Sequence, residues 1–300
     1  MLSVIMIEYQ DIWYTSADGL RLYARDYTPE QNRGTTAPTI LCMHGLTRNS
    51  ADFEDICKVL ADRYRLIVVD QRGRGLSDYD PDVANYNPLV YVQDMFRLLE
   101  VLDVSKVVLM GTSMGGIMAM MMATMKPSVI QGLIINDIGP EVGVLGLDRL
   151  KKYVGKATPI ANWHDAAKQS AEVNAIAFPA ASEEDWLRFA KRTYLENKNG
   201  VPVLAYDPKI AEPLNDEDNN TAAPNLWSVY DQICDKPMLL IRGELSDILE
   251  PGCVEVMRQK NTKLEVSEIP GVGHAPMLSE PAAQISIESF LSGVAPRGEC

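Results

Sequence analysis

The stretch Lys106-Val-Val-Leu-Met-Gly111-Thr-Ser113-Met-Gly115-Gly116 carries an apolar strand pattern into a helical pattern through a G-x-S-x-G turn. A sharp turn at this point strains the backbone of the serine. Glycine on either side avoids collisions with the neighbouring strand and helix. The stretch therefore predicts that Ser113 projects above a sheet as a nucleophile. Taken alone, the pattern also fits ordinary turn glycines around an incidental serine.

Short apolar strands alternate with helices on both sides of this turn. Continuous apolar strands between helices are typical of a parallel sheet that is covered on both faces. We therefore expect an α/β fold with a mostly parallel central sheet flanked by helices, opened by a hairpin at Asp18-Gly19. The predicted strands are 20–27, 39–43, 66–70, 106–110, 130–136, 237–242 and 263–269, and the predicted helices are 50–60, 89–102, 114–125, 252–259 and 282–291.

The stretch 139–233 has a different character. Aromatic residues are scattered through helical segments, no apolar strand run appears, and prolines interrupt the pattern. We expect a helical insertion over 139–233, between a first part of the core domain at 1–138 and a second part at 234–300.

A serine hydroxyl needs an adjacent base, and histidine is the usual one. His274 lies in the glycine-rich loop Gly-Val-Gly-His-Ala-Pro at 271–276, directly after the last predicted strand. A flexible backbone there turns the imidazole toward the carboxyl edge of the sheet, so we predict that His274 is the base. The alternatives are an exposed or capping His164 in the insertion and His44, which belongs to another motif.

The carboxylate that orients the base should follow a neighbouring strand. Asp247 follows the predicted strand 237–242, and its place between Ser113 and His274 in the chain is the order that accompanies a G-x-S-x-G turn. We predict Asp247 for this role. Asp137, which closes the strand 130–136, comes second, and Glu244 is a further alternative.

Attack on a carbonyl places negative charge on its oxygen, which backbone N–H groups usually stabilise. One donor would be Met114, the residue after the serine. The other would be Leu46, in the loop that follows the strand 39–43. Gly45 permits the turn of that loop, and His44 would hold the loop by hydrogen bonds.

With His44-Gly45, Gly111-Thr-Ser113-Met-Gly115 and Gly273-His274 in place, the chain resembles the α/β-hydrolase superfamily, in particular its capped, carboxylesterase-like members. The stretch 70–78, Asp-Gln-Arg-Gly-Arg-Gly-Leu-Ser-Asp, is similar to the D-x-R-G-x-G-x-S signature of that family, which is mainly structural. The resemblance implies an α/β-hydrolase fold in which 139–233 is a helical cap. Its large side chains would either line an acyl pocket or pack the cap against the core: Trp163, Trp186, Phe189 and Trp227.

Departures from other branches of the superfamily favour ester chemistry. Haloalkane dehalogenases and epoxide hydrolases carry aspartate where this chain has Ser113. Ring-cleavage C–C hydrolases typically place an aromatic residue after the base histidine, where this chain has Ala275. Perhydrolases favour tryptophan at the position of Leu46.

These patterns lead us to expect a serine hydrolase that cleaves carboxylic esters or lactones of small, mainly uncharged substrates through an acyl-enzyme on Ser113, without a cofactor or a metal. One alternative is a C–C hydrolase of β-diketones or ring-fission products with the same triad. Another is a non-catalytic receptor for small ligands on the same fold.

Composition narrows the partners. The chain has 300 residues, 46% of them hydrophobic, and a formal net charge of −13. An acidic chain is a poor match for the phosphates of nucleic acid, so we expect no nucleic-acid partner. It would also slow the approach of anionic substrates. The oligomeric state stays open.

The cysteines, the methionines and the N-terminus give no sign of a metal site, a disulfide framework or a secretory signal. Five cysteines without C-x-x-C spacing favour free, buried thiols over a metal site or disulfides, and methionines spread around the helix 114–125 favour core packing. Glu8 and Asp11 interrupt the apolar N-terminus before a secretory signal could develop, and no apolar stretch is long enough to span a membrane. We therefore expect a cytoplasmic protein without membrane contact.

Overall fold

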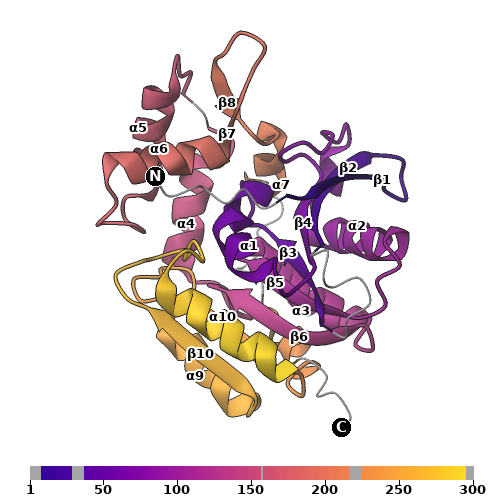
Figure 1. The fold of residues 1–300 in the computed structure, drawn as a ribbon. Coiled ribbons are helices and arrows are strands. Elements are labelled where there is room, and N and C mark those ends of the chain that lie inside the picture. The colour runs from indigo at the N-terminus through magenta and orange to yellow at the C-terminus, as the bar shows by residue number, and fades with distance from the viewer. Residues whose placement is uncertain (1–7, 29–36, 157, 216–224, 295–300) are drawn as a thin grey trace.

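The computed structural model describes residues 8–28, 37–156, 158–215 and 225–294. An eight-stranded sheet with the strand order β1-β2-β4-β3-β5-β6-β9-β10 runs through the molecule (Figure 1). β1 and β2 pair in antiparallel fashion, β2 and β4 likewise, and all remaining pairs are parallel. The strands are β1 (Gln10–Thr15), β2 (Arg21–Tyr27), β3 (Thr39–Met43), β4 (Leu66–Asp70), β5 (Val107–Thr112), β6 (Ile130–Asn136), β9 (Met238–Gly243) and β10 (Leu264–Ile269).

Helices cover both faces of the sheet. One face packs against α1 (Glu54–Leu60), which follows the 3-10 turn η2 (Ser50–Phe53), and against α10 (Pro281–Val294). The opposite face packs against α2 (Pro88–Val101), α3 (Met114–Met125), α8 (Trp227–Asp231) and α9 (Pro251–Lys260). The expected fold class is therefore confirmed.

The inner strands β3, β4, β5 and β9 are largely apolar because both faces of the sheet are covered there. In β4 every residue is buried, with Leu66 and Val68 in the cluster that contains α1 and α10, and Ile67 and Val69 in the cluster on the opposite face. Successive side chains of a strand point to opposite faces, so a strand between two helical layers needs apolar residues at every position.

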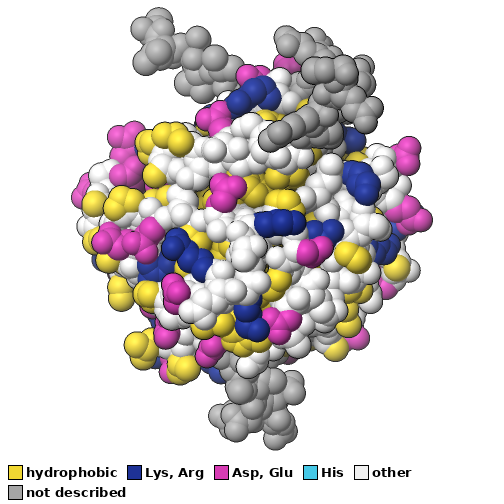
Figure 2. All heavy atoms as spheres, turned by 90° about the horizontal axis from the view of Figure 1, so that it is seen from below, with side chains coloured by type: hydrophobic (Ala, Val, Ile, Leu, Met, Phe, Trp, Pro, Cys, Tyr) yellow, Lys and Arg dark blue, Asp and Glu magenta, His cyan; other side chains and the backbone are white. Residues whose placement is uncertain are grey.

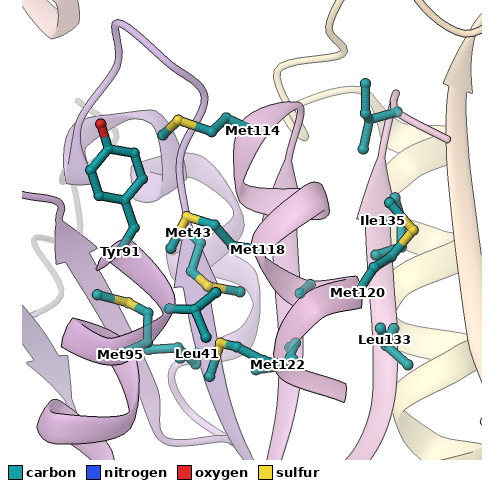
Figure 3. Close-up of a cluster of buried hydrophobic side chains, with 14 of the residues drawn as sticks. Leu41, Met43, Tyr91, Met95, Met114, Met118, Met120, Met122, Leu133 and Ile135 are labelled. Carbon is teal, nitrogen blue, oxygen red and sulfur yellow. The ribbon is translucent and has the colours of Figure 1, made fainter. Parts of the chain in front are cut away.

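Four methionines of α3 lie in this core, Met114, Met118, Met120 and Met122, while Met125 at the end of the helix is exposed. Figure 3 shows Met118 and Met122 on the side of α3 that faces Leu41, and Met120 on the side that faces Ile135. These three methionines, Leu41 and Ile135 are all fully buried. Their unbranched chains fit irregular gaps around the helix, which agrees with the predicted packing role.

The cysteines that the structure describes are all free thiols. Cys42, Cys57 and Cys253 are buried and Cys234 is partly buried, as the sequence indicated, while Cys300 lies outside the described residues.

The chain between β6 and β9 carries the predicted insertion. It contains α4 (Val144–Tyr153), α5 (Trp163–Asn174), α6 (Glu183–Thr193), the strands β7 (Tyr194–Glu196) and β8 (Pro202–Leu204), the turn η4 (Pro208–Ala211), α7 (Glu212–Asn215) and α8. α5, α6 and the β7–β8 hairpin lie together at one end of the molecule (Figure 1). We call residues 144–204 the cap.

The cap has a small core of its own, formed around Ala166, Ala190 and Trp186. The β7–β8 hairpin differs from the expected purely helical insertion, because strands of three residues are too short to leave an apolar run in the sequence. The domain boundaries at 138/139 and 233/234 stay predictions.

The surface shows charges of both signs. On the face in Figure 2, Lys and Arg side chains intermix with Asp and Glu, with apolar patches between them. None of the helices in the described part of the chain has both the length and the apolar character that crossing a membrane requires.

Candidate active site

Ser113 occupies the turn between β5 and α3. Its φ of 52° and ψ of −115° lie in a region that side chains disfavour. A side chain at Gly111 would collide with the carbonyl of Gly115, and one at Gly115 would collide with the carbonyl of Met43. Close backbone approach therefore requires both glycines, as the sequence indicated.

His274 joins Ser113 to a carboxylate. The Ser113 Oγ lies 2.8 Å from His274 Nε2, and His274 Nδ1 lies 2.8 Å from Asp137 Oδ2. A carboxylate only accepts hydrogen bonds, so Nδ1 carries the proton and Nε2 is left to accept from the serine hydroxyl. The three side chains form a continuous Ser-His-Asp chain.

The prediction that Asp247 orients His274 is wrong. Asp137, the second choice from sequence, holds the imidazole instead. The reason is the order of the strands, in which β6 lies between β5 and β9. Asp137 follows β6 directly, with a φ of 57°, and so lies one strand from Ser113, whereas Asp247 follows β9, two strands away.

Asp137 is fully enclosed and well supplied with donors. Its exposed fraction is 0%. Oδ1 accepts from the backbone N–H of Gly243 at 2.8 Å, and Oδ2 accepts from the Ser246 hydroxyl at 2.6 Å as well as from His274. A buried carboxylate is stable only with such partners. Ser246 was not recognised from sequence, since a lone serine after a strand carries no motif.

Asp247 binds a cap residue. Arg149 of α4 donates from Nε to Oδ2 at 2.7 Å and from Nη2 to Oδ1 at 2.9 Å. Partial burial works to raise the pKa of Asp247, but the hydrogen bonds and charge of Arg149 outweigh it and lower the pKa below its usual value. This ion pair ties the cap to the loop after β9.

The loop that carries His274 is fixed from three sides. Asn136 Nδ2 donates to the carbonyl of Pro276 at 2.8 Å. The N–H of Gly273 donates to the carbonyl of Ala177 in the cap at 2.7 Å. Glu244 accepts from the N–H of Gly271 at 2.8 Å, so this rival for the acid role holds the loop rather than the imidazole.

The loop after β3 lies against Ser113. A Cβ added to Gly45 would lie 3.7 Å from the Cβ of Ser113, and Gly45 and Leu46 line the same cavity as the serine. Met114 is the first residue of α3, where a backbone N–H has no carbonyl within the helix to bind. The two predicted donors, Leu46 and Met114, therefore flank the serine from two elements.

His44 holds this loop, as the sequence suggested. It is fully buried, its Nε2 accepts from the N–H of Gln71 at 3.1 Å, and its Nδ1 lies 2.7 Å from the carbonyl of Gly45. Burial lowers the pKa of His44 to about 3. The imidazole is neutral and serves as a brace. His164 lies exposed in α5 and does not line the cavity that contains Ser113.

The D-x-R-G-x-G-x-S stretch also supports the loop. Asp70 accepts from the N–H groups of Ser50 and Leu76 at 2.6 and 2.8 Å. Buried Arg74 donates from Nε to the carbonyl of Leu46 at 2.9 Å. The stretch is therefore structural, and Arg74 fixes the peptide chain next to Ser113.

A cavity of about 250 Å³ opens above the serine between the core and the cap. Ser113 and His274 form its floor, and cap residues that include Phe178 and Phe189 form walls. Of the four large side chains that the sequence singles out in the insertion 139–233, Phe189 lines this cavity. Trp186 packs against Phe189 with ring centroids 5.8 Å apart. A cavity over a Ser-His-Asp chain suits acyl transfer.

The chain belongs to the alpha/beta hydrolase fold family, whose model matches residues 38–281. It is a hydrolase, as are two relatives that match it along most of their length. It is 31% identical over 260 residues to the 3-hydroxybutyrate-oligomer hydrolase of Cupriavidus necator, covering 85% of this chain and 88% of that protein.

Two further hydrolases match this chain along most of its length. The 2-(acetamidomethylene)succinate hydrolase of Mesorhizobium japonicum is 27% identical over 256 residues, which cover 85% of this chain and 87% of that protein. The crystal structure of an alpha/beta hydrolase from Novosphingobium aromaticivorans matches with a TM-score of 0.89 at 38% identity, covering 96% of this chain and 99% of that one.

Proposed function

We propose that this hydrolase cleaves carboxylic esters through an acyl-enzyme on Ser113. The observation that supports this most is the pair of 2.8 Å contacts that link Ser113 to His274 and His274 to Asp137 at the floor of a cavity. Such a chain raises the nucleophilicity of a serine hydroxyl at neutral pH.

In the first half of the reaction, Ser113 Oγ bonds to the carbonyl carbon and its proton passes to His274 Nε2. The N–H groups of Leu46 and Met114 stabilise the charge on the carbonyl oxygen. His274 then gives the proton to the departing alcohol oxygen as the ester C–O bond breaks. Asp137 holds the imidazole through Nδ1 and stabilises the imidazolium.

In the second half, His274 takes a proton from water, and the hydroxyl attacks the acyl carbon. The bond to Ser113 Oγ breaks, the proton returns to that oxygen, and the carboxylic acid leaves. No step requires a cofactor or a metal.

The substrate class we propose is an ester of a small hydroxy acid, including short linear oligoesters. One support is the likeness to a 3-hydroxybutyrate-oligomer hydrolase along most of both chains. The other is the cavity lining, which mixes polar side chains such as Gln169, Asn174 and Lys156 with apolar ones. A substrate with recurring ester groups suits such a lining better than a plain hydrocarbon chain.

The test compares the unaltered protein with Ser113→Ala on p-nitrophenyl butyrate and on the 3-hydroxybutyrate dimer. Ser113→Ala should lower kcat by at least about 10³-fold on both. A fluorophosphonate probe should add its mass to the unaltered protein and leave Ser113→Ala unlabelled. Equal hydrolysis by the two proteins would overturn the proposal.

A further inference from the structure

A second cavity adjoins the one above Ser113. Its volume is about 220 Å³, and it lies between α6 of the cap and the loop that precedes α10. Three side chains line both cavities: Phe178, Phe189 and Met277. The two spaces therefore adjoin at these three residues.

The partition is aromatic on the cap side. Phe178 and Phe189 have ring centroids 6.2 Å apart, and both lie close to the Trp186 ring. The Phe178 side chain comes from the loop between α5 and α6. Methionine is unbranched and changes rotamer at little cost, so Met277 is the side chain that yields most easily.

The second cavity is lined by both apolar and charged groups. Ala180, Ala181 and Trp186 form apolar walls. The charged residues that line the cavity are Asp55, Asp185, Glu280, Arg188 and Arg192. Arg192 neutralises Asp55 through a contact of 2.7 Å. The arginine side chains of this lining can donate N–H groups to ester carbonyls, whereas a plain hydrocarbon chain offers them no acceptor.

We propose that the two cavities form one extended binding cleft, in which a linear oligoester places its reacting carbonyl at Ser113 and its remote units past Phe178 and Met277 in the second cavity. This inference rests on the proposed ester hydrolysis. It specifies that the substrate is a chain of several ester-linked units rather than a single small ester. The second cavity nearly doubles the space available.

The experiment measures kcat/KM on linear 3-hydroxybutyrate oligomers of two to five units. Ala180→Trp fills the second cavity from an exposed position in the cap. Ala84→Trp places the same side chain at an exposed position that lines neither cavity, and is the matched control. In the unaltered protein and in Ala84→Trp, the kcat/KM for the tetramer should exceed the kcat/KM for the dimer at least tenfold.

Ala180→Trp should lose most of that tetramer-to-dimer ratio. A ratio that stays high in Ala180→Trp, or one near unity in the unaltered protein, would overturn the extended cleft. Dimer hydrolysis that still depends on Ser113 would leave the proposed function standing in either case. Should Ala180→Trp fail to fold, Ser279→Trp fills the same cavity from the core side and carries the same test.

Discussion

Arg149 in the cap binds both carboxylate oxygens of Asp247, with contacts of 2.7 and 2.9 Å. The pairing satisfies Asp247 and leaves the imidazole of His274 to Asp137. Two aspartates therefore follow neighbouring strands, one bound to the reacting residues and the other bound to the cap.

Asp137→Asn should lower kcat for ester hydrolysis by about 10³–10⁴-fold, because an amide would favour the wrong imidazole tautomer and could not stabilise the imidazolium. Asp247→Asn is the matched control and should keep kcat within about tenfold. Steady-state kinetics on p-nitrophenyl butyrate distinguish the two variants. The reverse ranking would restore Asp247 as the acid.

Ser246→Ala should lower kcat about tenfold and leave KM nearly unchanged. The variant removes the hydroxyl that donates to Asp137 at 2.6 Å, so the carboxylate loses one charge-assisted hydrogen bond and holds His274 less firmly. Ser246→Thr keeps the hydroxyl and should recover most of the rate. If KM alone rose in Ser246→Ala, the serine would act on the substrate rather than through Asp137.

Removing Arg149 should change stability in a pH-dependent way. The pKa of Asp247 is lowered in the folded protein, so the pair stabilises the fold above the ordinary carboxyl pKa and the benefit is lost as pH falls through the lower folded value. Arg149→Met should cost about 1 kcal/mol of unfolding free energy at pH 7. Urea unfolding should show this difference shrinking below about pH 4. A difference independent of pH would point to lost packing instead.

His44 should make the protein sensitive to mild acid. Its pKa falls from 6.5 to about 3 on folding because the ring is buried. Between these two pH values the imidazole is therefore protonated in the unfolded chain and neutral in the folded protein. Stability should therefore decline as pH falls below about 6.5, by up to about 1.4 kcal/mol per pH unit. Urea unfolding at pH 7, 6 and 5 should show a shallower decline in His44→Asn. Parallel declines would contradict the role given to His44.

Much of the core could be predicted from sequence because local patterns determine it. β4 and β6, for example, are continuous apolar runs, and the predicted boundaries coincide with the observed ones. Ser113 and His274 were recognisable for a similar reason, since each lies in a short glycine-rich stretch next to a strand.

The acid could not be chosen correctly in this way. Asp137 and Asp247 both follow strands of the same sheet, and the chain does not reveal which strand lies nearer β5. Only the strand order β5-β6-β9 separates them. The signal that was available is that Asp137 directly ends the strand that comes next after the Ser113 turn. The roles of Arg149 and Ser246 could not be predicted from the sequence, because they depend on contacts between distant segments.

The enclosure of Asp137 has a consequence for the working environment of the enzyme. Dissolved ions weaken the attraction between exposed charges, but they do not enter a space with 0% exposure. The hydrogen bond between Asp137 and His274 should therefore not change with ionic strength. The Arg149–Asp247 contact, whose side chains are 18% and 27% exposed, should loosen as salt increases. High salt would then weaken the contact of the cap with the loop after β9, while the geometry of Ser113, His274 and Asp137 stays the same.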